Sequence, residues 1–437
     1  MDISMNDDFV YGRVPRAQRS TLFTITLIRI GSITALSQFM LGATLGHAMS
    51  FWQAMLATLL GSLILEFVGL GLGLAGVREG LPTSLLSRWC GFGRLGSALI
   101  GLAIGISSLG WFGVQNGIFA KSLAYAFEGK LSFAWCAVIS GLATTLLVAF
   151  GYRALGWTAR IAVPLFIMIV VWAAYHVLPG NSTAELFGYA RDRATTITLS
   201  AGATMVAGGY IVAALITPDI SRYCKDGKSV FWMMTISIIV GEFIVNALSI
   251  LIAHVLDTED VVSIMTQSAG WLGAASVMLA VVKVNDINLY SVSLGVSNFI
   301  HVWSGLRIKY SYITLIAGSV GTLFTVTGIL HKFIDFLMMV GVVFPPIAGI
   351  MLVDYYLLRT HRALLDATRQ EGTLPDRAAT PFVNGVALFS WGVGAVSGYV
   401  ITVGIPALNA IAIAGALYWL LSHLKHNDSK RVSEGER

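Results

Sequence analysis

The stretch IRIGSITALSQFMLGATLG, Ile28–Gly46, is an apolar segment of membrane-spanning length whose middle is rich in Gly, Ser and Thr. A second segment of this kind, SAGATMVAGGYIVAALITP, Ser200–Pro218, follows five apolar segments later. Gly-interrupted segments at matching positions in two halves of a chain indicate an inverted repeat with a binding site near the membrane midplane. Close packing through small residues would explain either segment alone, but the matched spacing favours two broken helices.

The composition is that of a polytopic membrane protein. Of the 437 residues, 56% are hydrophobic and 12% are charged, and the mean hydropathy is +0.76. Apolar windows of about 20 residues recur from end to end. They predict twelve spans, at 22–49, 51–76, 95–124, 131–151, 158–178, 196–217, 230–255, 266–300, 309–330, 333–358, 382–402 and 406–423. Several of these windows are longer than one crossing needs, which indicates tilt, a break or an attached surface helix.

The basic residues predict the orientation in the membrane. Most of the 28 Lys and Arg residues fall on the side of the N-terminus, which predicts cytoplasmic N- and C-termini in a cell-membrane protein. These basic loops account for the net charge of +5, so nucleic acid is not an expected partner. The organisation that we expect is a cytoplasmic tail over 1–20, five-helix repeats over 21–178 and 196–358, two extra spans over 382–423, and a cytoplasmic tail over 424–437.

Three charged residues inside predicted spans mark a substrate or ion pathway. Lys283 and Asp286 lie one helical turn apart in SVMLAVVKVNDINLYSVSLGVSN, Ser276–Asn298, and Glu242 lies in the middle of the seventh span. A charge at the bilayer centre costs about 2.5–3.5 kcal/mol on insertion scales. Such a group is tolerated where it faces the interior of a helix bundle or a wet cavity.

Two further charges fall within the first and second spans. Arg29 and Glu66 lie at similar estimated depths. Burying opposite charges as a pair is less costly than burying either one alone. We therefore expect a mutual ion pair with a structural role, and a gating role is the alternative.

Five stretches match a known family in order and in spacing. They are REGLPTSLLSRWCGFG (Arg78–Gly93), GWFGVQNGIFA (Gly110–Ala120), PDISRYCKD (Pro218–Asp226), NDINLYSVSLGVSN (Asn285–Asn298) and FPPIAGIMLVDYYL (Phe344–Leu357). On these motifs the chain resembles the nucleobase–cation symporter-1 family, and within it the bacterial cytosine permeases. The resemblance implies an all-α leucine-transporter-like fold with broken helices 1 and 6, two inverted five-helix repeats and two extra helices. It also implies a monomeric permease in the lipid bilayer that needs no cofactor and is not an enzyme.

The resemblance further implies that a flat heterocyclic substrate stacks between Trp111 on the third span and Tyr210 on the sixth. Stacking of a base on an aromatic ring contributes about 1–3 kcal/mol. The alternative is that both rings face lipid or pack between helices. Asn285 matches an Asn of the eighth span that binds the polar edge of the base, and its amide offers both donors and an acceptor.

Further candidates surround these residues. Gln38 on the first span, Ser108 on the third and Gly209, next to Tyr210, are expected at the substrate, although a helix–helix hydrogen bond explains Gln38 and Ser108 as well. Ser108 replaces a Gln of the cytosine permeases, and Val212 replaces a Ser. Both changes remove polar contacts, so a purine, a methylated pyrimidine or a thiamine-precursor pyrimidine is as plausible as cytosine.

A departure from the family pattern concerns the coupling ion. Sodium-coupled members hold the ion between spans 1 and 8 with two hydroxyl side chains, and the matching residues here are Lys283 and Val284. An ammonium group is a monovalent cation with three donors. We therefore hypothesise that Lys283 replaces sodium, which predicts proton coupling or sodium-independent transport. The alternative is a structural lysine paired with Asp286 or Glu242, and sodium coupling stays possible.

The sequence leaves two alternative functions. A transporter of the same fold for an amine or an amino acid, coupled to sodium, would use Trp111 and Tyr210 as a cation–π cage. A membrane enzyme or a receptor is the other class. The eight His residues are scattered and the three Cys residues form no metal or disulfide pattern, so neither a metal site nor an enzyme is expected.

Overall fold

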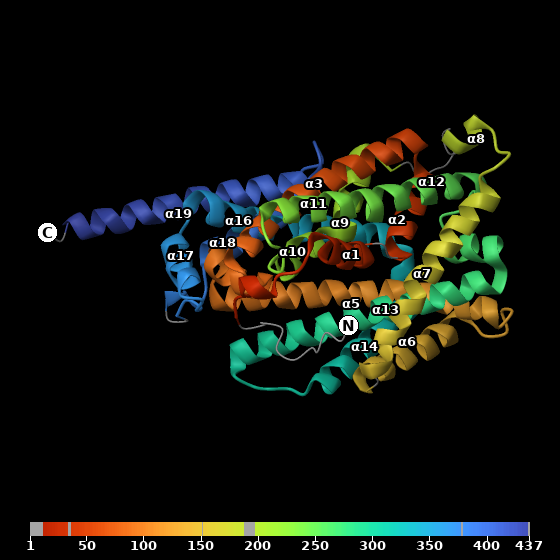
Figure 1. The fold of residues 1–437 in the computed structure, drawn as a ribbon, viewed down its shortest axis with the longest axis horizontal. Helices are drawn as coiled ribbons and strands as arrows, with labels where there is room; N and C mark the ends of the chain where they lie inside the picture. Colours follow the sequence, from red (N-terminus) through yellow and green to blue (C-terminus); the bar gives the residue numbers. More distant parts are fainter. Residues whose placement is uncertain (1–11, 34–35, 151, 188–196, 377–378, 436–437) are drawn as a thin grey trace.

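The computed structural model describes residues 12–33, 36–150, 152–187, 197–376 and 379–435. The parts of the two predicted tails at 1–11 and 436–437, and residues 34–35 in the first predicted break, therefore lie outside the described residues. The molecule is a bundle of helices along one long axis (Figure 1). Helix α17 and the C-terminal end of α19 lie at one end of this bundle, and α8 lies at the other (Figure 1).

The first predicted broken helix is broken. Helix α1 spans Leu22–Ile33 and α2 spans Leu36–Ala48, and the two are bent by 59°. Nearly all residues of α2 are buried, including its polar ones. The Gly-, Ser- and Thr-rich middle of the segment therefore coincides with a real change in chain direction inside the bundle.

The sixth predicted span is also broken, but at a different residue from the Gly pair. Helix α9, Leu199–Leu215, runs through Gly208 and Gly209, and the break falls at Ile216 before the short α10, Thr217–Ser221. A Cβ on Gly208 would lie 2.1 Å from the carbonyl oxygen of Leu337, so this glycine allows close packing. Pro218 has no N–H for an intrahelical bond, which favours a new helix start there.

The remaining spans follow the predicted order. They are α3 (Phe51–Glu79), α5 (Gly93–Ala126), α6 (Phe133–Phe150), α7 (Tyr152–Val177), α11 and α12 (Gly227–Ile238 and Val245–Leu256), α13 (Val261–Ser304), α14 (Tyr310–Val326), α15 and α16 (Phe333–Val343 and Pro345–Leu352), α18 (Gly385–Val400) and α19 (Pro406–Gly435). Among the described residues, seven helical stretches are long and apolar enough to cross a membrane, or eight if the bent pair forms one span. Four shorter apolar helices complete a set that corresponds to the twelve predicted spans.

Helix α13 shows why its predicted window was too long for one crossing. The helix is interrupted at Ala269 and Gly270, and Gly270 has φ 51° and ψ −129°. This backbone conformation is open to glycine and strained for other residues. The segment before the kink folds back so closely that a Cβ on Gly273 would collide with the carbonyl of Met265.

Helices α5 and α13 cross with almost no side chains between them. A Cβ on Gly295 would lie 2.3 Å from the carbonyl oxygen of Gly101, and a Cβ on Gly105 would lie 3.3 Å from the Cα of Val292. Small residues of this kind let membrane helices approach closely. This close approach sets the relative positions of the polar residues near the middle of each helix, such as Ser108 on α5 and Asn285 on α13.

Short helices occur in the polar connections. They are α4 (Thr83–Ser87), α8 (Thr183–Phe187) and α17 (Arg362–Gln370). Helix α17 lies within the polar stretch between the tenth and eleventh spans. Helix α19 continues through most of the predicted C-terminal tail, beyond the predicted end of its span at 423.

Candidate functional site

Tyr210 lies at the break in the first span. Its hydroxyl donates a hydrogen bond to the carbonyl oxygen of Ile33 at 2.8 Å and lies 3.4 Å from Oγ of Ser37. Ile33 is the last residue of α1, and the last carbonyls of a helix have no partner within it. The side chain of Tyr210 therefore joins the two broken helices, with its ring beside the break. Its neighbour Gly209 faces Leu41 of α2, because a Cβ there would lie 3.2 Å from Cδ2 of Leu41.

Gln38 is fully buried one turn into α2. Its Nε2 donates to Oδ1 of Asn246 at 2.7 Å, and Asn246 in turn donates to Oγ1 of Thr58 at 3.1 Å. The Oε1 atom of Gln38 is buried and accepts no hydrogen bond from the described residues. One end of the amide is thus anchored to α12, and the other end is able to accept a hydrogen bond from a ligand.

Trp111 and Asn285 form a second group. The ring of Trp111 packs edge-on against Phe336 at 5.2 Å and Phe333 at 6.1 Å between ring centroids. Nδ2 of Asn285, on α13, donates to the carbonyl oxygen of Phe112, which follows Trp111 on α5, at 3.4 Å. Ser108 is buried one turn before Trp111 on the same face of α5.

The predicted substrate residues therefore fall into two groups. Trp111, Ser108 and Asn285 lie along the crossing of α5 and α13, and Tyr210, Gly209 and Gln38 lie around the break in the first span. Helix α2 packs against both α9 and α13. In the described part of the chain, no ring contact joins Trp111 to Tyr210.

The three predicted coupling residues are not all together. Lys283 is partly buried, and the charge that acts on it is that of Asp286 on the same helix. Glu242 is 1% exposed and lies in a π-helical turn, Ile239–Ile244, between α11 and α12. Its Oε2 accepts a hydrogen bond from Oγ of Ser62 at 2.8 Å. Asp286 lies one helical turn from Lys283, but no ion pair within 4 Å joins them among the described residues, and Glu242 is hydrogen-bonded to Ser62 instead of the lysine.

Arg29 connects the two broken helices. It is 2% exposed, and its guanidinium donates to the carbonyl oxygen of Ala213 at 3.0 Å and to Oγ1 of Thr217 at 3.3 Å. Glu66 accepts a hydrogen bond from Thr235 at 2.9 Å. Glu66 also attracts Arg29 electrostatically. The predicted mutual ion pair is therefore not formed within 4 Å among the described residues, and hydrogen bonds to Ala213 and Thr217 tie α1 to the break in span 6 instead.

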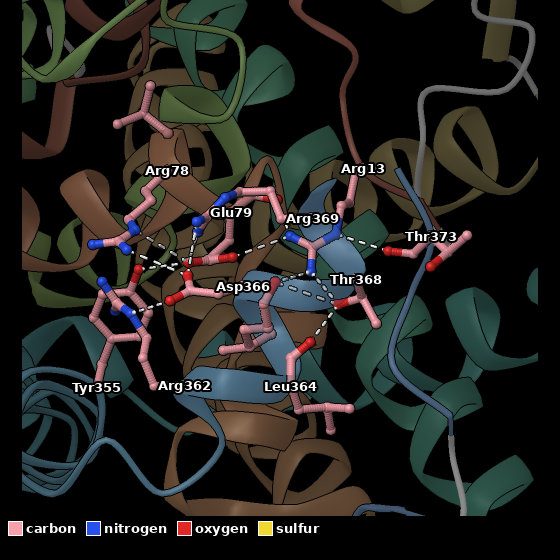
Figure 2. Close-up of polar contacts among 12 residues, drawn as sticks. Arg13, Arg78, Glu79, Tyr355, Arg362, Leu364, Asp366, Thr368, Arg369 and Thr373 are labelled. Atoms are coloured by element: carbon pink, nitrogen blue, oxygen red, sulfur yellow. Dashed lines mark hydrogen bonds and ion pairs between the residues drawn. The ribbon is translucent and has the colours of Figure 1, made fainter. Parts of the chain in front are cut away.

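A polar cluster around Glu79 was not predicted from the sequence. Glu79 ends α3 with a fully buried side chain, which forms ion pairs with Arg369 at 2.9 Å and Arg13 at 3.1 Å (Figure 2). The hydroxyl of Tyr355 donates to Oε1 of Glu79 at 2.8 Å. Arg78, at 3.8 Å, completes what we call the Glu79 cluster: Arg13, Arg78, Glu79, Tyr355 and Arg369. A carboxylate at the end of a long apolar helix was its only sequence signal.

The Glu79 cluster fastens helix α17 and the N-terminal segment to the bundle. Arg13 also donates to the carbonyl of Leu365 at 3.2 Å and to Oγ1 of Thr368 at 3.0 Å (Figure 2). Asp366 lies beside the cluster and pairs with Arg369 at 2.7 Å. Burial acts to raise the pKa of Asp366, but the neighbouring arginines outweigh it and hold this pKa below its ordinary value. Two segments far apart in the sequence are thus joined by charge-assisted hydrogen bonds.

Comparisons with known proteins identify the family of the chain. A sequence model of the family described as "Permease for cytosine/purines, uracil, thiamine, allantoin" matches residues 13–421. The chain is 28% identical over 423 residues to the cytosine permease of Escherichia coli (strain K12), covering 96% of this chain and 95% of that protein. It is 24% identical over 381 residues to the hydantoin permease of Microbacterium maritypicum, covering 80% and 76%.

Solved structures show the same fold. The inward-facing conformation of Mhp1 matches with a TM-score of 0.81 at 19% identity, over 95% of this chain and 93% of that chain. Mhp1, described as a nucleobase-cation-symport-1 family transporter, matches in a closed conformation with a TM-score of 0.69 at 21% identity, over 95% of both chains. These matches confirm the predicted fold class. The chain therefore belongs to the family of permeases for cytosine/purines, uracil, thiamine and allantoin, and it is a polytopic membrane transporter rather than an enzyme.

Proposed function

We propose that the chain imports a nucleobase or a related heterocycle by alternating access, with the ring held between Trp111 and Tyr210. The observation that carries the proposal is the hydrogen bond from Tyr210 to Ile33, because it puts an aromatic ring at the break of the first span. Broken helices of this kind border the midplane sites of transporters. We expect the second ring, that of Trp111, to cover the other face of a flat substrate.

The polar groups around these rings suit a cyclic amide. Asn285 is held beside Trp111, and Oε1 of Gln38 is an unoccupied acceptor among the described residues. A buried polar edge of a substrate must find such partners, or its desolvation is not compensated. The names of two relatives, a cytosine permease and a hydantoin permease, refer to small nitrogen heterocycles with such edges. Ser108 and Val212 favour a more substituted ring than cytosine.

A binding screen tests this proposal. Purified protein is titrated with cytosine, uracil, purines, hydantoins and thiamine-precursor pyrimidines, and with amines and amino acids as the competing class. Saturable binding of one of the heterocycles, weakened by Trp111→Ala, is the expected result. Binding of an amine or amino acid in place of every heterocycle would overturn the proposal.

We also propose that transport does not require sodium, because Lys283 supplies the cation near the first span. Its ammonium is partly buried and lies near Asp286, so a carboxylate balances its charge within the helix. Proton exchange at this pair is the form of coupling that the arrangement suits best.

Uptake of the identified substrate is compared in sodium-containing and sodium-free buffers, for wild type and Lys283→Thr. We expect wild-type uptake to be equal in both buffers, and the Lys283→Thr variant to lose uptake or to gain sodium dependence. Strict dependence of the wild type on sodium would disprove the role of Lys283 without affecting the assignment of the substrate.

The orientation that we propose has the Glu79 cluster, α17 and both chain ends on the cytoplasmic side of the cell membrane. The basic residues of these segments support it, and we expect the transporter to act as a monomer. Trypsin added to inside-out vesicles should cleave the segment around Arg16, whereas right-side-out vesicles should protect it.

A further inference from the structure

A cavity of about 860 Å³ opens beside the Glu79 cluster. It lies where the N-terminal segment, the end of α3, the start of α11 and the region after α17 meet. We call it the basic cavity. Its basic lining residues are Arg13, Arg16, Arg19, Arg78, Lys225 and Arg369. Six cations therefore face a space whose acidic lining residues are Glu79 and Asp226.

The two carboxylates of the basic cavity are already engaged. Glu79 is bound by the arginines of its cluster and by Tyr355. Asp226 accepts hydrogen bonds from the backbone N–H and the hydroxyl of Ser229, both at 2.7 Å, as the N-cap of α11. These acids therefore neutralise little of the remaining positive charge.

Three of the cations have no acidic partner. In the part of the chain that the structure describes, no carboxylate lies within 4 Å of Arg16, Arg19 or Lys225. Arg19 donates instead to the carbonyl oxygens of Val77, Cys224 and Lys225. Burial lowers the pKa of its guanidinium, and the like charge of Arg16 lowers this pKa further. An anion in the cavity would relieve this repulsion.

The surface next to the basic cavity is apolar. Phe23 and Leu27 on α1 are 73% and 52% exposed, and Phe231 and Trp232 on α11 are 42% and 43% exposed. Helices α1 and α11 pack against each other, and both begin within a few residues of the cavity lining. The cavity is therefore at the level where α1 and α11 enter the membrane, and a lipid-facing wall runs from it along both helices.

We propose that the basic cavity binds the phosphate headgroup of an anionic phospholipid, whose acyl chains lie along α1 and α11. A phosphate presents several oxygens to arginine side chains, which suits a site where Arg16 and Arg19 have no carboxylate partner among the described residues. The apolar wall distinguishes a lipid from a free phosphate ion. The bound lipid bridges Arg16 and Arg19 to Lys225, and it thereby fixes the segment that leads directly into the first broken helix.

The test measures lipid binding to the full-length protein in detergent, by native mass spectrometry and by thermal unfolding. The probes are phosphatidylglycerol, phosphatidylcholine and inorganic phosphate. The variant Arg16→Gln/Lys225→Gln removes two exposed cations that are outside the Glu79 cluster. The matched control is Arg307→Gln/Lys309→Gln, which removes two exposed cations from the loop after α13.

Wild type and control should retain phosphatidylglycerol in preference to phosphatidylcholine and be stabilised by it. Loss of two cations near the surface should weaken phosphatidylglycerol binding by about 30-fold. Equal binding of both lipids, or equal loss in the variant and the control, would overturn the site. Stabilisation by inorganic phosphate to the same extent would overturn the lipid assignment, because the apolar wall would then contribute nothing. Native mass spectra also report folding, so an unfolded variant is replaced by Lys225→Gln alone.

Discussion

At the scale of the residue, the hydroxyl and the ring of Tyr210 have separate tasks. The hydroxyl satisfies the carbonyl of Ile33 at the end of α1, and in the proposed function the ring stacks on the substrate. A hydrogen bond of this kind contributes about 1 kcal/mol to stability, whereas stacking on a base contributes about 1–3 kcal/mol to binding. The two contributions are separable by substitution.

Tyr210→Phe keeps the ring and removes the hydroxyl, so we expect a small loss of thermal stability and binding close to that of wild type. Tyr210→Leu removes the ring as well, and substrate binding should weaken about 5- to 150-fold, which corresponds to 1–3 kcal/mol. Isothermal titration and thermal unfolding in the same detergent measure both effects. Equal affinity of the Phe and Leu variants would show that the ring does not touch the substrate.

Charge within an apolar segment was the part of the site most open to prediction. Lys283 and Asp286 stand out in the sequence one helical turn apart, but no ion pair within 4 Å joins them among the described residues, so their role stays a prediction. The partner of Glu242 was not predictable, because its bond to Ser62 depends on the register of α3 against the π-helical turn. The register of α3 against this turn cannot be derived from a single sequence.

At the scale of the element, Gly208 allows α9 and α15 to touch. Its missing side chain leaves room for the carbonyl oxygen of Leu337, 2.1 Å from where a Cβ would be. Gly208→Ala should therefore destabilise the protein by about 1–3 kcal/mol, as overpacking does. Thermal unfolding in detergent measures this loss.

Gly392, in the interior of α18, is the matched control because a Cβ there would meet nothing within 4 Å. Gly392→Ala should be neutral or stabilise the helix by up to about 1 kcal/mol. If both substitutions had the same effect, close packing of α9 on α15 would not be the reason for Gly208.

The position of the second helix break was predictable in part. Glycines suggested an interruption near Gly208, yet α9 continues through them, because glycine in a membrane helix serves packing as readily as breaking. The decisive residue was Pro218, which has no N–H to continue the hydrogen-bond pattern of α9. Prolines are common near the ends of membrane spans, so Pro218 alone did not indicate a helix break. The structure of α10 shows that it marks one.

At the scale of the whole molecule, the Glu79 cluster links the N-terminal segment, α3, the tenth span and α17. Removing one partner from a buried ion pair costs about 3–5 kcal/mol. In Glu79→Gln the amide keeps an acceptor for Tyr355 but loses the charge that holds Arg13 and Arg369. We expect the N-terminal segment and α17 to detach more often while the spans stay folded.

Limited proteolysis with trypsin measures this detachment as faster cleavage after Arg16. Glu371→Gln is the control, because Glu371 is exposed just after α17 and lies outside the Glu79 cluster. Wild-type cleavage rates in Glu79→Gln would contradict a fastening role for the cluster.

The span order and the fold class were predictable because hydropathy and the five motifs extend over nearly the whole chain. The cluster was not, since Glu79 and Arg369 are separated by 290 residues. Helix α17 also has a polar sequence that reads as a loop. Its contacts with Arg13 and Glu79 join residues far apart in the chain, so no local pattern reveals these contacts.

The Glu79 cluster also bears on biosynthesis. Glu79 leaves the ribosome 290 residues ahead of Arg369, which at roughly 5–20 residues per second is a delay of about 15–60 s. During that interval the carboxylate has only Arg13 and Arg78 as cluster partners. A nascent chain that stops before α17 therefore lacks the ion pair between Glu79 and Arg369 and the anchoring of Arg13 to α17. We expect this to let membrane quality control distinguish unfinished chains from completed ones.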